Sequence, residues 1–222
     1  MQQLLWRRFG FQNLLFWLFV YLLVNPFLSS VPHSRLIFRL LLTLVLFFAV
    51  FAVHREKNIM TLSVVLLALA VVLYWFGVFG IIRYSGLVSQ FIIILYLSVL
   101  VYSFFVAIFS AKTVSSEVIC ATLCLYLILG LFWAQIFVLL ETVVPGSFGG
   151  KILDPGCPPW QQVQSFVYFS FITLTTLGYG DITPQTQGAG ALCQAEAIIG
   201  QFYIAVLVAR LVSMYGSTGH KR

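Results

Sequence analysis

The sequence TLGYGD at residues 176–181 has the residue types and spacing that can bind a cation. Gly178 and Gly180 flank one tyrosine, and glycine allows backbone conformations that a Cβ atom forbids. Successive carbonyl oxygens can then turn toward one side of the chain. Four such strands around an axis would form stacked oxygen rings that replace the water shell of a monovalent cation. A tight turn between two helices is the simpler alternative for the same residues.

The longer sequence TTLGYGD at residues 175–181 resembles the selectivity filter of the potassium channel superfamily, with leucine where many members have valine. The resemblance begins at about residue 118 and covers less than half of the chain. It implies four chains around one pore, with K⁺ as the permeant ion and no other cofactor. The implied ion ligands are the backbone carbonyls of Thr176, Leu177, Gly178 and Tyr179 and the hydroxyl of Thr176, with Gly180 at the outer mouth.

Residues on both sides of this filter sequence are expected to support it. In the family, the acid that follows the filter is bonded to an aromatic donor on the preceding helix, which implies a contact between Tyr168 and Asp181. The alternative is that Asp181 is an exposed carboxylate that attracts cations to the mouth. Thr175 lies at the C-terminal end of the preceding helix, where the helix dipole favours a cation. Some members have a glutamate behind the filter where this chain has Ile172, so no gating step that needs that acid is expected.

The last apolar stretch is expected to line the inner pore. Gly200 lies 20 residues after Gly180, at the family's hinge spacing, and a packing glycine is the alternative. Gln201 would face the central cavity. An apolar stripe at helical spacing follows, which either closes the pore by dewetting or packs within the helix bundle. The stripe consists of Ile204, Ala205, Val208 and Val212.

Glu196 is an ionisable residue in the same stretch, one helical turn before Gly200. Such groups are costly within a membrane and are often functional. The carboxyl group can hydrogen-bond to the pore helix of its own chain or of a neighbour, in protonated form. It can also add negative charge to the cavity, and the sequence leaves both roles open.

The composition is that of a membrane protein with several spans. Of 222 residues, 61% are hydrophobic and only 8% are charged, whereas soluble domains have about a quarter charged residues. The formal charge of +6 comes without a basic cluster for a nucleic-acid groove, so it indicates topology. The spans contain no paired acids, no nucleophile with a base and no metal cluster, which argues against an enzyme. The four cysteines have no CxxC spacing and are expected to be buried thiols. Cys157 is the exception, because it lies in a polar loop.

Six stretches have about the 20 apolar residues that cross a bilayer core. A shorter piece, about Gln162–Thr175, would be roughly 20 Å long as a helix, which is too short to cross. We expect it to be re-entrant, opened by Pro158-Pro159 and followed directly by the filter. The predicted fold class is an all-α membrane protein with a pore helix and filter between the fifth and sixth spans. These spans are Phe9–Leu28, Leu36–Val53, Met60–Phe79, Leu87–Phe109, Val118–Leu140 and Gly190–Tyr215.

The predicted domains are an N-terminal region of four helices at 1–115, a pore domain at 116–216 and a short cytoplasmic tail at 217–222. A voltage sensor would need arginines at every third residue of the fourth span, and Leu87–Phe109 has no charge. Arg39, the one charged residue in the first four spans, is near enough to an end to snorkel. These helices are therefore expected to brace the pore. Lone polar residues that either bond helices together or line a small site are Ser63, Gln90, Ser98 and Ser103.

Basic residues are biased toward one side of the predicted topology. The bias predicts both termini in the cytoplasm and the filter mouth outside the cell. We expect the first span to be retained, because Asn25-Pro26 is not a signal-peptide cleavage site. A prokaryotic inner (plasma) membrane fits this compact chain, in which no attached ligand-binding domain is expected. The inner residues are Arg7, Arg8, Arg55, Lys57, Lys112, Lys221 and Arg222, and the outer ones are Arg35, Arg83 and Lys151.

Together these features predict a homotetramer in a lipid bilayer that conducts K⁺ passively and selectively. One alternative is a weakly selective cation channel, against which the complete Gly-Tyr-Gly argues. Another is a transporter or accessory membrane subunit with a channel-like loop. Potassium transporters of the superfamily keep one glycine per loop and place four loops in one chain, whereas this chain has one loop with both glycines.

Overall fold

The computed structural model describes residues 2–27, 34–52, 57–76, 85–111, 115–154, 156–157 and 162–219. Within these ranges the chain is mostly helical and has one short two-stranded sheet. The helices are α1 (Gln2–Phe27), α2 (Ser34–Ala52), α3 (Lys57–Phe76), α4 (Ser85–Phe109), α5 (Ser116–Val143), α6 (Val163–Leu174) and α7 (Gln187–Gly219), and the strands are β1 (Phe148–Gly150) and β2 (Ile182–Pro184).

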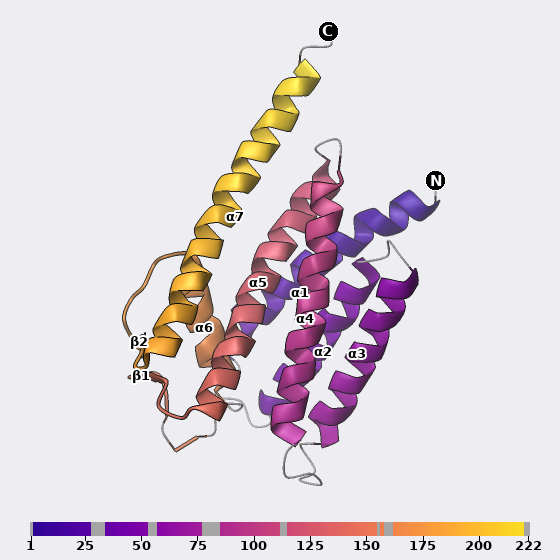
Figure 1. Cartoon of the computed structure of the whole chain (residues 1–222). Coiled ribbons are helices and arrows are strands. Elements are labelled where there is room, and N and C mark those ends of the chain that lie inside the picture. Colours follow the sequence, from indigo (N-terminus) through magenta and orange to yellow (C-terminus); the bar gives the residue numbers. More distant parts are fainter. Residues whose placement is uncertain are drawn as a thin grey trace.

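The first four helices pack beside α5 (Figure 1), with α1 against α2 and α5, and α4 against α3 and α5. One continuous hydrophobic core includes Leu14 of α1, Leu100 of α4 and Leu125 of α5. The N-terminal helices and α5 therefore share buried surface, and the close packing of their side chains holds them together.

Polar side chains join the same helices. Gln90 of α4 donates to the side-chain oxygen of Gln135 on α5 at 2.6 Å, and both residues are buried. Ser98 and Ser103 instead donate to carbonyls of their own helix at 2.8 and 2.7 Å. Of the lone polar residues in the first four helices, Gln90 thus bonds helix to helix, which is a common use of such groups among apolar neighbours.

The short helix α6 lies between α5 and α7, next to the two strands at one end of the bundle (Figure 1). Strand β1 pairs antiparallel with β2, so that Gly149 lies opposite Thr183. This pairing ties the segment that follows the filter sequence to the loop that follows α5. The beginning of α1 and the end of α7 lie toward the other end of the bundle.

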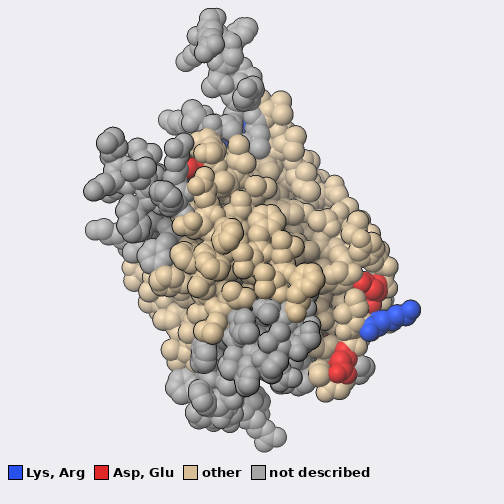
Figure 2. Space-filling model, turned by 180° about the vertical axis from the view of Figure 1, so that it is seen from behind, with Lys and Arg blue, Asp and Glu red and all other residues tan. Residues whose placement is uncertain are grey.

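The apolar stretches lie on described helices of two kinds, those long enough to cross a membrane and shorter ones. The space-filling view has an uncharged belt across the middle of the described surface, with charged groups toward the ends (Figure 2), as contact with a bilayer core requires. Among the described residues, three helices are long and apolar enough to cross a membrane: Leu87–Phe109, Ser116–Val143 and Gln187–Arg210. Shorter apolar helices cover Gly10–Val24, Leu40–Val50, Thr61–Val72 and Val163–Leu174.

Several expectations from the sequence can be compared with this fold. The short piece expected at about Gln162–Thr175 corresponds to α6, a helix of 12 residues. Pro158-Pro159, expected to open it, lies outside the described residues, and the helix begins after Gln162. The strand pair is an addition to the all-α class. Among the basic residues behind the topology prediction, only Lys151 has a described side chain, so that prediction lies outside the described part.

Candidate ion-binding site

Helix α6 ends directly before the filter sequence. Gln162 precedes its first turn, and the Gln162 side chain bonds the backbone of Asp154 and Cys157 at 2.7–2.8 Å, which fixes this end to the preceding loop. At the other end, the hydroxyls of Thr173 and Thr175 donate to the helix carbonyls four residues earlier. The C-terminal end of α6, with its partial negative charge, is thereby aimed at the start of the filter sequence.

The backbone after α6 alternates between two conformations. Thr176, Gly178 and Gly180 have φ angles of 60°, 52° and 75°, and in the described chain Thr176 is the one non-glycine residue with positive φ. Leu177 and Tyr179 between them have ordinary φ. A threonine in the left-handed region is uncommon and costs energy, which is typical of a functional site. Alternation of this kind turns successive carbonyl groups toward one side.

The carbonyl oxygens of this segment have no hydrogen-bond partner within the part of the chain that the structure describes. The amide groups of Leu177 and Gly178 both donate back to the carbonyl of Ile172, at 2.9 and 3.4 Å. No hydrogen bond among the described residues ends on the carbonyls of Thr176, Leu177, Gly178 or Tyr179. Four consecutive carbonyls without a partner among the described residues, on a backbone that alternates in this way, are suited to bind cations.

Asp181 follows the filter sequence and contacts α6. The Tyr168 hydroxyl donates to Oδ2 of Asp181 at 2.5 Å, and Oδ1 accepts from the amide of Ile182 at 3.0 Å. The carboxylate therefore joins the outer part of α6 to the first residue of β2. Ile172, on the same helix, is buried.

We expect Tyr168→Phe to weaken this support without changing ion preference. The substitution removes one hydroxyl donor and keeps the ring, which costs about 1 kcal/mol per chain. The melting temperature of the assembled protein should fall, while the ratio of K⁺ to Na⁺ flux in liposomes stays unchanged. Tyr102→Phe, at an exposed position on α4, is the matched control, and an equal fall for both variants would contradict the role.

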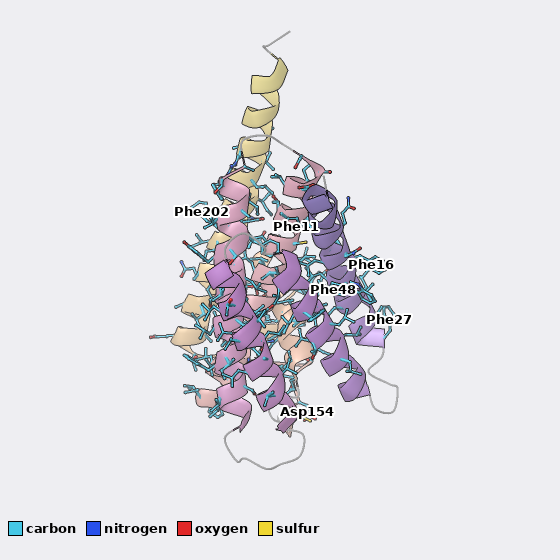
Figure 3. All side chains as sticks on the ribbon, turned by 90° about the vertical axis from the view of Figure 1, so that its right-hand side faces the viewer. Phe11, Phe16, Phe27, Phe48, Asp154 and Phe202 are labelled. Atoms are coloured by element: carbon cyan, nitrogen blue, oxygen red, sulfur yellow. The ribbon has the colours of Figure 1, made fainter. Side chains whose placement is uncertain are left out.

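The loop after α5 is held by contacts that the sequence analysis did not predict. The two carboxylate oxygens of Glu141 accept from the amides of Gly146 and Phe148, at 2.7 and 2.9 Å. Asp154 lies at the end of the molecule opposite the C-terminus (Figure 3). Hydrogen bonds from the Gly156 amide and then the Cys157 thiol lower the pKa of Asp154. No local sequence pattern marks the two Glu141 bonds, whereas the bond from Gly156 to Asp154 is that of an Asx turn, which Asp and Gly favour.

Helix α7 approaches the base of the filter sequence closely. Gly200 is buried, and a Cβ atom there would overlap the carbonyl oxygen of Leu174 at the end of α6. This contact is what a packing glycine makes. One residue later, the side-chain amide of Gln201 donates to the hydroxyl of Thr176 at 3.0 Å, and that hydroxyl donates to the carbonyl of Thr175. Gln201, expected to face the cavity, thus also contacts the innermost residue of the filter sequence.

Beyond Gly200 one face of α7 is open. The apolar stripe expected to gate the pore or pack in the bundle is exposed in the single chain, with Ile204 at 43%, Val208 at 53% and Val212 at 65%. Ala205 is exposed as well. The stripe therefore does not pack within its own chain.

Two contacts of α7 were missed by the sequence analysis. The Tyr203 hydroxyl donates to the carbonyl of Thr122 on α5 at 2.6 Å. The Arg210 guanidinium donates to the carbonyls of Phe109 and Ala111, at 3.0 and 3.1 Å, and lies 4.5 Å from the centre of the Phe109 ring. A cation at the C-terminal end of α4 is favoured by the helix dipole. The only sequence signal was an arginine within an apolar stretch.

Comparisons with known proteins agree with this geometry. The sequence model of a family described as "Ion channel" matches residues 121–216. The potassium channel protein kcv of Paramecium bursaria Chlorella virus 1 is 32% identical over 76 residues, which are 34% of this chain and 80% of that protein. No solved structure matches the chain.

Two longer relatives match part of this chain. The two pore potassium channel c of Oryza sativa subsp. japonica is 34% identical over 70 residues, and TWiK family of potassium channels protein 7 of Caenorhabditis elegans is 38% identical over 63 residues. The matches cover 32% and 28% of this chain but only 14% and 11% of those two proteins. The 32% identity to a protein covered over 80% of its length, together with the family match at residues 121–216, leads to one conclusion: the chain belongs to the potassium channel superfamily.

Proposed function

We propose that this protein is a potassium-selective channel, in which four identical chains surround one pore and K⁺ moves passively down its electrochemical gradient. The observation that carries the proposal is the alternating backbone of residues 176–180, with its row of unbonded carbonyls. Rings of such oxygens replace the hydration shell of K⁺. The ligands are the carbonyls of Thr176, Leu177, Gly178 and Tyr179 and the Thr176 hydroxyl.

Assembly from four copies is supported by the surface of the single chain. One chain supplies one filter strand, whereas a ring of oxygens needs several. Tyr179 is 67% exposed and Phe202 of α7 is 66% exposed. Large aromatic side chains at this exposure fit an interface between copies, with Gly180 at the outer mouth and the stripe at Ile204–Val212 lining the inner pore.

The arrangement in the membrane is part of the same proposal. Helix α6, with 12 residues, is about 18 Å long at 1.5 Å per residue, so it enters the membrane and returns. Helices α1 to α5 and α7 are the six spans, with both termini in the cytoplasm of a cell whose plasma membrane holds the channel. The beginning of α1 and the end of α7 point to one end of the bundle and the filter sequence lies near the other (Figure 1).

The test is ion flux through the full chain in liposomes that carry either a K⁺ or a Na⁺ gradient. Under the proposal, K⁺ flux exceeds Na⁺ flux by more than about tenfold, a barrier difference of at least about 1.4 kcal/mol. Comparable fluxes would instead indicate a weakly selective cation channel, and no flux would indicate a transporter or accessory subunit. The mass of the protein in detergent should correspond to four chains of 25.0 kDa each, and a stable monomer would overturn the assembly.

A further inference from the structure

Three helices meet at one buried polar cluster, made of Gly130 on α5, Ser170 on α6 and Glu196 on α7. Ser170 and Glu196 are both 0% exposed. The Ser170 hydroxyl oxygen lies 2.7 Å from the carbonyl oxygen of Gly130 and 2.5 Å from Oε1 of Glu196. Oε2 of Glu196 has no hydrogen-bond partner among the described residues.

The number of hydrogens in this cluster is decisive. The Gly130 carbonyl can only accept, and the Ser170 hydroxyl has a single hydrogen to donate. If Glu196 were ionised, two acceptors would compete for that hydrogen, and one close pair of oxygens would have none between them. If Glu196 carries a proton, its carboxyl group donates to Ser170 and Ser170 donates to Gly130. One hydrogen then lies between the two oxygens of each close pair.

The surroundings of Glu196 favour the same protonation state. A buried carboxylate is costly unless a cation or several donors compensate it. In the part of the chain that the structure describes, no lysine, arginine or histidine interacts with Glu196. The titratable groups that face it are Tyr126 on α5 and Cys193 on α7, which are uncharged at neutral pH, and α6 contributes Ser170 and no charged residue.

We propose that Glu196 is a neutral acid whose proton starts a hydrogen-bond chain from α7 through α6 to α5, and that this chain positions the pore helix behind the filter. The inference rests on the proposed function for its role in conduction. Ser170 lies one turn before Leu174, whose carbonyl packs against Gly200. This hydrogen-bond chain therefore acts on the contact between α6 and α7 immediately before the filter sequence begins.

The proposal fixes the direction of a pH effect. The assembled protein holds a proton that the carboxyl group gives up to water in the unfolded chain at neutral pH. Where the unfolded state binds fewer protons, stability falls as pH rises. In alkaline solution Glu196 loses its proton, Ser170 turns toward the carboxylate, and the Gly130 carbonyl loses its donor. The chain of bonds is then broken at α5.

The experiment compares the full chain with three variants. Glu196→Gln keeps a donor toward Ser170 but cannot lose a proton, whereas Ser170→Ala removes the central hydroxyl at every pH. Glu117→Gln, at a partly buried acid in the first turn of α5, is the matched control. Melting temperatures are measured at about pH 6 and about pH 9, and infrared spectra at about pH 7, where exposed carboxyl groups are ionised.

The wild type is expected to show the carbonyl band of a protonated carboxyl group, which Glu196→Gln lacks and Glu117→Gln retains. Its melting temperature should fall by about 4 °C or more between the two pH values, and that of Glu117→Gln should fall equally. Glu196→Gln should lose this pH dependence, and Ser170→Ala should melt below the wild type already at about pH 6. A missing band in the wild type overturns the proposal even if Glu196→Gln does not fold. An unchanged pH dependence in a folded Glu196→Gln also overturns it.

These measurements do not depend on conduction, so the two proposals can fail separately. A channel that selects K⁺ but has no protonated carboxyl group would refute the role of Glu196 alone. A protonated Glu196 in a protein without selective flux would refute the proposed function alone. With both correct, Glu196→Gln keeps the K⁺ preference of the wild type, because the cluster supports the filter without contacting the ion.

Discussion

Replacing Gly178 with alanine is expected to abolish K⁺ flux while the rest of the chain folds. Gly178 has a φ angle of 52°, and nothing lies within 4 Å of the position that a Cβ atom would occupy. Within the single chain the effect is therefore one of backbone conformation and not of space. Alanine in the left-handed region costs about 1–2 kcal/mol per chain, or about 4–8 kcal/mol in four chains. The backbone is expected to leave this conformation, and its carbonyl rings are lost with it.

Liposome flux measures this effect directly, with an expected fall of K⁺ flux by at least about a hundredfold, equal to about 2.7 kcal/mol of barrier. Gly146→Ala is the matched control, because Gly146 has a φ angle of 85° and is equally unobstructed, but lies in the loop after α5. That variant carries the same kind of strain and should conduct as the wild type does. Normal selective flux in Gly178→Ala would exclude the ion-binding role of this backbone.

A second large effect is expected from Gly200→Ala, which separates the packing and hinge roles of this glycine. The added Cβ atom would overlap the carbonyl oxygen of Leu174 and lie 3.0 Å from Cδ1 of the same residue. A backbone oxygen at the end of a helix cannot turn aside as a flexible side chain does, so α7 must move away from α6. Overpacking of this kind costs roughly 1–3 kcal/mol per chain.

The melting temperature of Gly200→Ala should therefore fall by about 4 °C or more, and K⁺ flux should fall because the base of the filter sequence shifts. Gly188→Ala serves as the control on the same helix, since nothing lies within 4 Å of its Cβ position. A hinge role predicts a different pattern. In that case Gly200→Ala would melt like the wild type, and only its flux would change.

The elements around the filter could be predicted from the sequence because their signals are local. The length of α6 follows from the apolar run between polar loops, and its described bounds, Val163–Leu174, differ by one residue at each end from those expected. The positions of Tyr168 and Asp181 came from the family resemblance. Their hydrogen bond is present in the structure, while their role in supporting the filter stays a prediction.

Other parts of the site could not be predicted, because they depend on which elements meet in space. Glu141, Tyr203 and Arg210 all bond backbone groups on another element or loop, and backbone groups leave no trace in a sequence pattern. The short strands β1 and β2 have three residues each, too few for a periodic signal. The direction of Gln201 depends on the distance between α7 and the filter sequence, which Gly200 sets.

The contacts of α7 with α4 determine how far this chain could be shortened and still fold. The family match covers residues 121–216, yet Arg210 is bonded to carbonyls of Phe109 and Ala111, outside that range. A chain that began at residue 116 would leave the guanidinium without both acceptors and would uncover the side of α5 that packs against α1 and α4. Evolution toward a minimal pore would therefore need a new surface for α5 and a neutral residue in place of Arg210.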